Sequence, residues 1–364
     1  MMKILVLAQT PPPLHGQSQM VETLVIGLPA CGIEVRHVQM RLSRSHADIG
    51  RWRPGKILPA VFAALAARRA ARRENCDAIY YVPAPAKRGA LYRDVVVMGL
   101  CRDRRRKLVL HWHAPGLGAW LLGRATSFER ALALRALGGA DLSIVLAPEL
   151  EPDARVLAPR RTVVVPNGIP DPGPAPRRAG GAPTELLFLG LGSWEKGLHD
   201  TVEAVSILNA RRPGSFRLTF AGSFRGDGER KHFMRRAMDL GDAIRHSGFA
   251  DERRKRELFS GADVFCLPTI YPNEGQPLAL IEALAYDLRI VTTRWRAIPG
   301  MLPPGNVWYV EPGRPAEMAA AIEAAAAAPR PDGAMRRHFL EHFTRERHLD
   351  RLAAALLQLK ERAE

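Results

Sequence analysis

Short apolar runs alternate along the first half of the chain with longer stretches whose apolar residues recur every three or four positions. Short runs bounded by polar residues are typical of buried strands, and the longer periodic stretches are typical of amphipathic helices. Regular alternation of the two predicts a parallel sheet with helices on both faces. Strands are predicted at residues 3–9, 34–38, 78–82, 107–111, 142–146 and 162–165, and helices at 17–30, 91–101 and 127–137.

A second alternation of the same kind begins at residue 185, after a segment of different composition. Residues 169–183 are rich in Pro and Gly, which is typical of a linker and not of regular structure. The pattern therefore predicts two Rossmann-like α/β domains, residues 1–168 and 184–343, joined by the linker 169–183. Strands are predicted at 185–190, 216–221, 263–267 and 289–293, and helices at 198–210, 228–240, 252–259, 277–286, 315–327 and 346–362.

The bulk composition is that of a globular protein, with 47% hydrophobic and 25% charged residues in a chain of 364. No apolar run reaches the roughly 18 to 20 residues that a membrane span needs. The first eight residues hold only a short apolar strand, too brief for the core of a signal peptide. The four cysteines show no C-x-x-C spacing, which argues against a zinc site or a disulfide framework. We therefore expect a protein of the reducing cytoplasm, with a peripheral place at the inner face of the plasma membrane left open.

The positive charge is concentrated in the first half. Residues 1–165 contain 25 Lys/Arg and 12 Asp/Glu, so that +13 of the net +16 lies there. Two basic clusters flank the apolar segment 57–65, an arrangement that suits an anionic membrane surface. A solvated helix face is the alternative, and nucleic acid is not expected because no aromatic RNA-binding motif or helix-turn-helix accompanies the arginines. The clusters are Arg51, Arg53 and Lys56; Arg68, Arg69, Arg72 and Arg73; and Arg102, Arg104, Arg105, Arg106 and Lys107.

The stretch 272–285 carries two acids, Glu274 and Glu282, separated by seven residues. The first lies in a polar loop after a predicted strand, and the second lies on the helix that this loop opens. Free N–H groups from Gly275 to Leu278, together with the helix dipole, would suit an anion such as a nucleotide diphosphate. Gln276 lies within this run, and Pro277 fits the first helical turn, where its missing N–H costs nothing.

This stretch closely resembles the E-x7-E signature of the retaining glycosyltransferases of family four, which have the GT-B fold. The resemblance implies two Rossmann-like domains whose parallel sheets face each other across an interdomain cleft. It also implies that a last helix, within 344–364, crosses back onto the first domain. Glu274 would lie beside the donor sugar, and Glu282 would bind the ribose. Two solvated helix acids are the alternative for such a spacing alone, but the loop Asn-Glu-Gly-Gln-Pro-Leu makes the match more specific.

Two strand ends of the first half also resemble the family. Residues 11–18 occupy a strand-to-helix loop, where Gly16 corresponds to the glycine that approaches the donor phosphates and Gln17 follows it. No G-x-G-x-x-G fingerprint is present, which disfavours a dinucleotide-dependent oxidoreductase. His113 matches a histidine that lies close to the reacting sugar, with His111 as the second candidate. A His-x-His pair also has metal-ligand spacing, but the sequence offers no third ligand nearby.

The segment 187–197 resembles the family's phosphate loop. It contains Ser193 and Lys196, and the resemblance implies that Lys196 neutralises the diphosphate as charge builds on the leaving group. An exposed lysine in a loop is the alternative. Leu191 stands where many members carry an arginine, and Arg225 and Arg294 are both possible replacements.

Three further positions complete the comparison with the family. Asn167 and Gly168 match the interdomain pivot, where left-handed backbone is permitted. Residues 246–249, ending in Phe249, match a segment that lies against the nucleobase. Asp287 and Gly300 depart from the pattern, each at a peripheral position.

The resemblance thus implies a metal-independent, retaining transfer of sugar from a UDP- or GDP-linked donor to an acceptor hydroxyl, without a cofactor. Glu274, His113 and Lys196 are the expected catalytic residues, and the leaving phosphate oxygen would accept the acceptor's proton. Domain closure about Asn167 and Gly168 would exclude water. The basic first half favours a lipid-linked saccharide acceptor in bacterial capsule, exopolysaccharide or lipopolysaccharide synthesis.

Four other functions stay open at this point. A soluble small-molecule acceptor is the nearest, within the same enzyme class. A 2-epimerase or hydrolase on the same scaffold would need its own acid and base groups. A non-catalytic nucleotide-sugar-binding protein is kept open by Leu191. A protein that binds anionic polymers would bind nucleic acid in a salt-sensitive manner and would not bind the donor.

Overall fold

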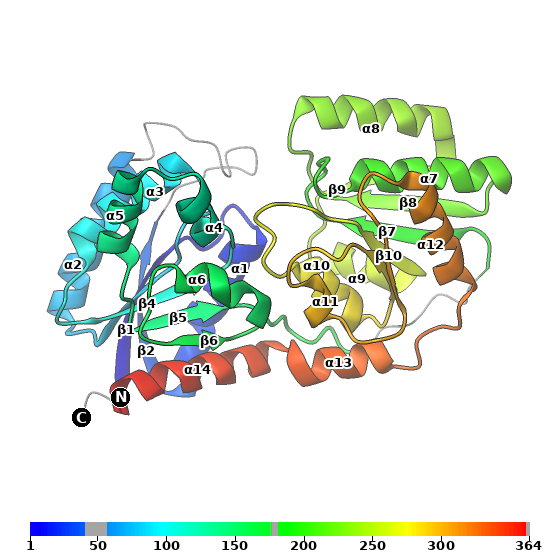
Figure 1. Ribbon diagram of the computed structural model, residues 1–364. Helices are drawn as coiled ribbons and strands as arrows, with labels where there is room; N and C mark the ends of the chain where they lie inside the picture. The colour runs from blue at the N-terminus through cyan, green and yellow to red at the C-terminus, as the bar shows by residue number, and fades with distance from the viewer. Residues whose placement is uncertain (41–56, 175, 177–180, 362–364) are drawn as a thin grey trace. The chain divides into compact units, whose positions relative to one another are not determined.

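The computed structural model describes residues 1–40, 57–174, 176 and 181–361 of the chain. It forms two compact units, which Figure 1 colours by position along the chain. The first unit consists of Met1–Gly168, Asn273–Gln276 and Arg345–Glu364, and the second of Ile169–Pro272 and Pro277–Thr344. The basic cluster predicted at Arg51, Arg53 and Lys56 lies outside the described residues.

The first unit is built on a six-stranded parallel sheet in the order β2-β1-β3-β4-β5-β6. Every strand predicted in this half is present, within one residue or two at each end. The strands are β1 Met2–Ala8, β2 Ile33–Gln39, β3 Ala78–Tyr81, β4 Lys107–Trp112, β5 Leu142–Val145 and β6 Thr162–Val164. The helices are α1 Gly16–Gly27, α2 Ile57–Arg73, α3 Arg88–Cys101, α4 Leu117–Gly123, α5 Ser127–Leu137, α6 Glu151–Arg155 and α14 Arg345–Glu361.

Helix α14 completes the core of the first unit, although it follows the whole second unit in sequence. Its residues Leu349, Leu352 and Leu356 pack in the same buried cluster as Ile4 and Val6 of β1. The methyl groups of Leu349 lie where a side chain on residue 27 of α1 would be, so α14 packs closely on α1 at this glycine. The return of the last helix to the first unit is therefore fixed by apolar packing.

The second unit is built on another six-stranded parallel sheet, in the order β12-β11-β10-β7-β8-β9. Its four inner strands match the predictions, and its two edge strands, β9 and β12, were not predicted. The strands are β7 Thr184–Leu189, β8 Phe216–Ala221, β9 Ile244–Gly248, β10 Val264–Leu267, β11 Arg289–Thr292 and β12 Val307–Tyr309. The helices are α7 Leu198–Arg211, α8 Asp227–Leu240, α9 Glu252–Gly261, α10 Leu278–Ala285, α11 Ile298–Met301, α12 Pro315–Ala327 and α13 Ala334–His342.

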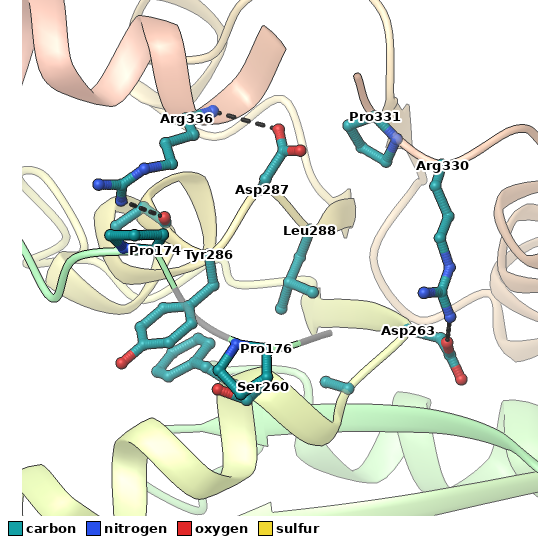
Figure 2. A pocket seen from close by; sticks show the side chains of 13 residues that line it. Pro174, Pro176, Ser260, Asp263, Tyr286, Asp287, Leu288, Arg330, Pro331 and Arg336 are labelled. Atoms are coloured by element: carbon teal, nitrogen blue, oxygen red, sulfur yellow. Dashed lines mark hydrogen bonds and ion pairs between the residues drawn. The ribbon is translucent and has the colours of Figure 1, made fainter. Parts of the chain in front are cut away.

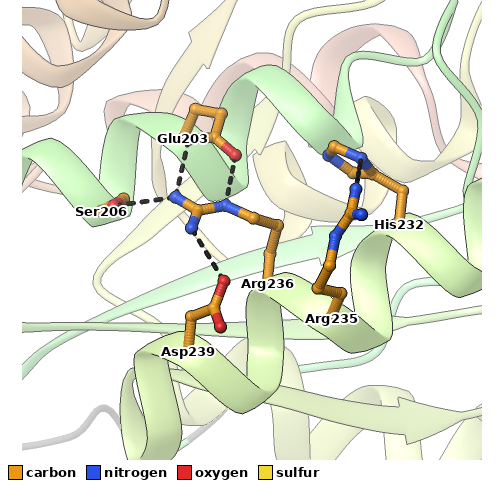
Figure 3. Close-up of polar contacts among 6 residues, drawn as sticks. All are labelled: Glu203, Ser206, His232, Arg235, Arg236 and Asp239. Carbon is orange, nitrogen blue, oxygen red and sulfur yellow. Dashed lines mark hydrogen bonds and ion pairs between the residues drawn. The ribbon is translucent and has the colours of Figure 1, made fainter.

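Helices α7 and α8 are joined by a polar network on their shared side (Figure 3). The guanidinium of Arg236 donates to both carboxylate oxygens of Glu203, at 2.6 and 2.8 Å, and to the hydroxyl of Ser206 at 3.0 Å. Asp239 accepts a further bond from the same guanidinium at 3.2 Å. A bidentate arginine of this kind fixes α8 against α7 with defined geometry.

The start of the predicted linker belongs by its contacts to the second unit. The N–H of Ile169 donates to the carbonyl of Phe343 at 2.9 Å, and the carboxylate of Asp171 accepts from Arg336 at 2.8 Å. Neither Asn167 nor Gly168 has the positive φ that the Asn-Gly pair permits. Asn167 is held by side-chain hydrogen bonds instead.

Within the described ranges, no helix combines the length and the apolar character that crossing a membrane requires. The apolar segment 57–65 forms the first half of helix α2. The sequence prediction had left open whether this segment is a membrane-facing or a solvated helix.

Candidate functional site

Loops from three neighbouring strands, β7, β10 and β11, meet at the carboxyl edge of the second sheet. The N–H of Ile270, in the loop after β10, donates to the carbonyl of Glu195, in the loop after β7, at 2.7 Å. The indole N–H of Trp295, after β11, donates to the carbonyl of Tyr271 at 2.9 Å. Parallel strands end at one edge of a sheet, and ligands of such folds bind there. The hydrogen bonds make this edge a connected structure.

Gly197 allows the end of the segment 187–197 to pack tightly against the loop after β10. Its φ is 78°, and a Cβ on it would lie 2.5 Å from both the ring and the carbonyl oxygen of Pro268. No side chain could be accommodated without moving the backbone. The neighbouring Lys196 is thereby held over this loop, with its Nζ 5.2 Å from the centre of the Tyr271 ring.

Arg225 is the cation that lies next to this loop, in a chain that has Leu191 where the family has arginine. Its guanidinium forms an ion pair with the carboxylate of Glu195. Its backbone N–H donates to the carbonyl of Gly192 at 3.0 Å. The hydrogen bond and charge of Glu195 raise the pKa of Arg225, so the guanidinium is permanently charged.

Arg294, the other suggested replacement, lies towards the opposite side of the sheet. Its guanidinium stacks 4.1 Å above the ring of Tyr309, which ends the edge strand β12. Arg294 follows β11, which β10 separates from β7 in the sheet. Arg225 follows β8, which is adjacent to β7, so Arg225 is nearer to Lys196 in strand order.

Glu282, the predicted ribose ligand, is buried and paired. Only 8% of it is exposed, and its Oε1 lies 2.8 Å from Nζ of Lys255 on α9. Burial raises the pKa of Glu282, and Lys255 offsets this only in part. Burial also acts to lower the pKa of Lys255, but the carboxylates of Glu282 and Glu252 outweigh it and the pKa is raised. Lys255 was not identified from the sequence.

The helix that follows the loop begins one residue later than predicted. Pro277 is the N-cap, with φ −66° and ψ 118°, and Leu278 is the first helical residue of α10. Pro277 remains helix-compatible in φ but takes an extended ψ, because a residue at the cap leaves the helical path. The early N–H groups of α10 therefore start at Leu278.

Ser193 and Phe249 differ in their access to a ligand. Ser193 is fully buried, and its hydroxyl accepts the N–H of Lys196 at 3.3 Å, which stabilises the turn. Phe249 is 55% exposed at the end of β9, where an aromatic ring can stack on a base. His246 accompanies it, with Nε2 2.9 Å from the carbonyl of Gly222.

The loop 273–276 packs inside the first unit, although the sequence prediction placed it in the second domain. A Cβ on Gly275 would lie 2.6 Å from the carbonyl oxygen of His113, so the loop backbone rests directly on the end of β4. The side-chain oxygen of Gln276 accepts the N–H of Asn167 at 2.6 Å. Glu274, in the same loop, is buried, with 7% exposure.

His113 is half-buried and belongs to a histidine cluster in the first unit whose other members, His111 and His348, are fully buried. Its ring centre lies 4.1 Å from that of His111, which lies 6.4 Å from that of His348 on α14. The hydroxyl of Tyr80 bonds Nδ1 of His111, and Nε2 of His113 is buried without a hydrogen-bond partner among the described residues.

Burial dominates the charge state of this cluster. Desolvation, followed by the charges of His348 and His15, lowers the pKa of His113 to about 3. Desolvation likewise lowers the pKa of His348 to about 4. Both imidazoles are therefore neutral near pH 7. His15 is the N-cap of α1, and Gly16 and Gln17 open that helix beside it.

The structure thus distributes the predicted site residues in two groups. Those of the first unit are Gly16, Gln17, His113, Glu274, Gly275 and Gln276, and those of the second are Ser193, Lys196, Phe249, Pro277, Leu278 and Glu282. The sequence missed Lys255, Tyr271 and His348, which make contact with predicted residues across long stretches of chain. No spacing rule connects such pairs.

A cavity of about 150 Å³ in the second unit is separate from these loops (Figure 2). Asp263 and Leu288 on its wall directly precede β10 and β11, so it lies at the amino ends of the strands. Arg330 bonds Asp263 at 2.7 Å across its wall. Pro174 and Pro176 of the linker also line it. The linker therefore forms part of the cavity wall and packs against the second unit.

A comparison with known protein families agrees with the motifs found in these loops. Residues 183–327 match the model of the family described as Glycosyl transferases group 1. This range contains Lys196, Lys255, Glu274 and Glu282. The resemblance to family four that the motifs carry is therefore confirmed.

Similar proteins extend the comparison. The chain is 31% identical over 149 residues to the putative colanic acid biosynthesis glycosyltransferase WcaL of Salmonella typhimurium, covering 40% of this chain and 36% of that protein. It is 29% identical over 147 residues to the amylovoran biosynthesis glycosyltransferase AmsK of Erwinia amylovora, covering 38% and 35%. These matches span about a third of each relative's length.

A solved structure matches over nearly the whole chain. Anabaena Alr3699/HepE in complex with UDP-glucose has a TM-score of 0.70 and 16% identity, covering 98% of this chain and 100% of that one. At this identity the likeness shows the fold. The α/β two-domain fold expected for a group 1 glycosyltransferase, GT-B, is confirmed.

Proposed function

We propose that this chain is a retaining glycosyltransferase that moves a sugar from a nucleoside-diphosphate donor to an acceptor hydroxyl without a metal ion. The observation that carries the proposal is the joined edge of the second sheet. Gly197 packs on Pro268 and the carbonyl of Glu195 accepts the N–H of Ile270, which holds Lys196 beside the loop after β10.

The diphosphate would be bound by two cations and by the start of α10. Lys196 and Arg225 lie on adjacent loops, and Arg225 supplies the guanidinium that Leu191 cannot. The free N–H groups that begin at Leu278 add the positive end of a helix dipole. Charge that develops on the departing phosphate would then be stabilised without a metal ion.

The nucleoside would be held by Glu282 and Phe249. The Oε1 of Glu282 is fixed by Lys255, which leaves its second oxygen as the acceptor for ribose hydroxyls. The exposed ring of Phe249 would stack on the base. The Anabaena HepE complex contains UDP-glucose, so uracil is the base to test first, with guanine as the alternative.

The sugar would meet Glu274 and His113. With a pKa of about 3, His113 is far too weak a base to take a proton near pH 7. Its neutral ring can donate one hydrogen bond through the unpartnered Nε2, which suits a sugar oxygen. The acceptor's proton would go to the leaving phosphate oxygen as the glycosidic bond forms on the same face.

The acceptor we propose is a lipid-linked saccharide in bacterial surface polysaccharide synthesis, at the inner face of the plasma membrane. WcaL and AmsK are named for colanic acid and amylovoran biosynthesis, which are pathways of this class of product. A soluble small-molecule acceptor is the second candidate. Assay of lipid-extracted and soluble acceptor pools with one labelled donor would separate the two.

Calorimetric titration of the full chain with UDP and with GDP tests the donor site. We expect micromolar binding of one nucleotide, unchanged by EDTA, and at least tenfold weaker binding to Glu282→Gln and Lys196→Ala variants. Arg253→Gln, an exposed change on α9, serves as the control. Failure of both nucleotides to bind would overturn the proposal. Once an acceptor is found, NMR of the product's anomeric proton tests retention.

A further inference from the structure

Helix α2 presents its large apolar side chains to solvent and its smallest ones to the protein. Leu58, Phe62 and Leu65 are 64%, 67% and 36% exposed. Steps of four and three residues place them on one stripe of the helix. The buried side consists of alanines: Ala60, Ala63, Ala64, Ala67 and Ala71. A helix of a water-soluble surface has the reverse arrangement.

The same stripe becomes basic in the second half of α2. Arg69, Arg72 and Arg73 continue it at helical spacing, and all three are exposed. Asp103 lies 4.0 Å from Arg72, and Glu74 after the helix pairs with Arg36. Arg69 and Arg73 form no ion pair with the residues that the structure describes. The stripe therefore carries net positive charge.

Neighbouring helices extend the apolar part of this face. The connections β2–α2–β3, β3–α3–β4 and β4–α5–β5 place α2, α3 and α5 on one face of the first sheet, as Figure 1 shows. On α3, Tyr92 and Val96 are 42% and 40% exposed, and on α5 Phe128 is 66% exposed. Arg68 bonds the carbonyl of Leu100 at 3.3 Å, which fixes α2 to α3.

We propose that this α2–α3–α5 face is a docking surface for an anionic lipid bilayer. Phe62, Leu58 and Leu65 would enter the boundary between headgroups and acyl chains. Arg69, Arg72 and Arg73 would contact lipid phosphates, with their long stems along the apolar boundary. The proposal concerns the first unit alone and holds whether or not the donor site acts as proposed.

Charge and apolar exposure together select this partner. A second copy of the chain whose α2 packed on this one would offer the arginines no acidic partner, because α2 contains no Asp or Glu. A nucleic acid would use the arginines but would leave Phe62, Leu58 and Phe128 without a role. An anionic bilayer accommodates both halves of the stripe.

Vesicle co-sedimentation of the full chain tests the surface. We expect it to bind vesicles in which roughly a third of the lipid is phosphatidylglycerol, and to bind phosphatidylcholine vesicles at least tenfold more weakly. Leu58→Ser with Phe62→Ser should weaken anionic binding about tenfold, and so should Arg69→Gln with Arg72→Gln and Arg73→Gln.

Helix α8 supplies matched controls, because its side chains of the same kinds are exposed on the second unit. Met234→Ser with Met238→Ser removes two exposed apolar side chains, and Arg230→Gln with Lys231→Gln and Arg235→Gln removes the same charge. Neither change should alter binding. A Phe62→Trp variant should show a blue shift in fluorescence on anionic vesicles, and circular dichroism verifies folding of each variant.

Several results would overturn the proposal. One is no binding to anionic vesicles at low salt, and another is equal loss in the α8 charge control. Binding to a polynucleotide that needs the arginines but not Phe62, without vesicle binding, would assign the face to nucleic acid. Sedimentation of a dimer that Phe62→Ser dissociates, again without vesicle binding, would assign it to a second copy.

Discussion

Nζ of Lys255, on helix α9, donates to Oε1 of Glu282 at 2.8 Å, and the two residues are 27 positions apart in the chain. Both side chains are largely buried, at 13% and 11% exposure. In the proposed function, the other oxygen of Glu282 is the one left for the ribose. The lysine is a positioning residue for the proposed ribose contact.

Replacement of Lys255 by Met should both destabilise the protein and weaken nucleotide binding. It leaves a buried carboxylate without its partner, at a cost of about 3 kcal/mol. Glu282→Gln in the same chain should recover much of the stability but not the binding. Urea unfolding and UDP calorimetry on the two single variants and the double variant measure this. Additive stability losses would show that the pair is not coupled.

Arg225→Ala should weaken UDP binding about tenfold, because one of two cations at the phosphate loop is removed. Arg294→Ala should change it by less than about twofold, since that side chain stacks on Tyr309. Both variants lose one positive charge, so each controls for the other. Equal effects would argue that neither arginine replaces the missing one at Leu191.

Gly275→Ala should destabilise the first unit by about 1–3 kcal/mol, since the new methyl would lie 2.6 Å from the carbonyl of His113. Gly99→Ala on α3 is the matched control, because nothing lies within 4 Å of its added Cβ. That change should stabilise by about 0.5–1 kcal/mol. Thermal unfolding of both variants gives the comparison, and a neutral Gly275→Ala would contradict the close approach.

Asp287 should prove structural. It has a φ of 56°, and its carboxylate accepts N–H groups of Gly333, Met335 and Arg336 at 2.9, 3.0 and 3.2 Å. Asp287→Gly would relieve the backbone but lose these bonds, for a net cost of about 1–2 kcal/mol. Asp287→Asn should cost less. Denaturant midpoints measure both, and a stabilised glycine variant would disprove the capping role.

Stability should fall as the pH is lowered from about 6.5, because burial lowers the folded-state pKa of His113 to about 3 and of His348 to about 4. The unfolded chain then binds protons that the folded one does not. At pH 5 each such histidine costs about 2 kcal/mol. His348→Gln should make the urea midpoint less sensitive to acid, unlike His342→Gln, whose side chain is 43% exposed.

The inner strands could be predicted because they are buried on both faces, as in the Val264–Leu267 strand. The two edge strands of the second sheet, β9 and β12, were not predicted, although the edge strands β2 and β6 of the first sheet were. Ile244–Gly248 contains Arg, His and Ser, and Val307–Tyr309 has only three residues, so neither presents an apolar run. An edge strand contacts one neighbour and keeps polar side chains in water.

The residues of the candidate site divide in the same way, into those that a sequence motif reveals and those that only the fold reveals. Glu274, Glu282 and Lys196 are recognisable because neighbouring residues in sequence surround them with a motif. Lys255 and His348 reach the site residues only through the fold, from helices whose own sequences favour a solvated lysine or histidine. The stacking of Gly275 on His113 joins residues more than a hundred positions apart. Only the packing of the first unit brings them into contact.

The packing of α14 has a consequence for the order of folding during synthesis. Leu349, Leu352 and Leu356 share one buried cluster with the first strand, so the first unit has an open apolar surface until residues 345–361 have been translated. The second unit can close before the first. A ribosome-bound chain halted with residues 345–361 still inside the exit tunnel should therefore expose the first unit to chaperones and proteases while the second is already protected.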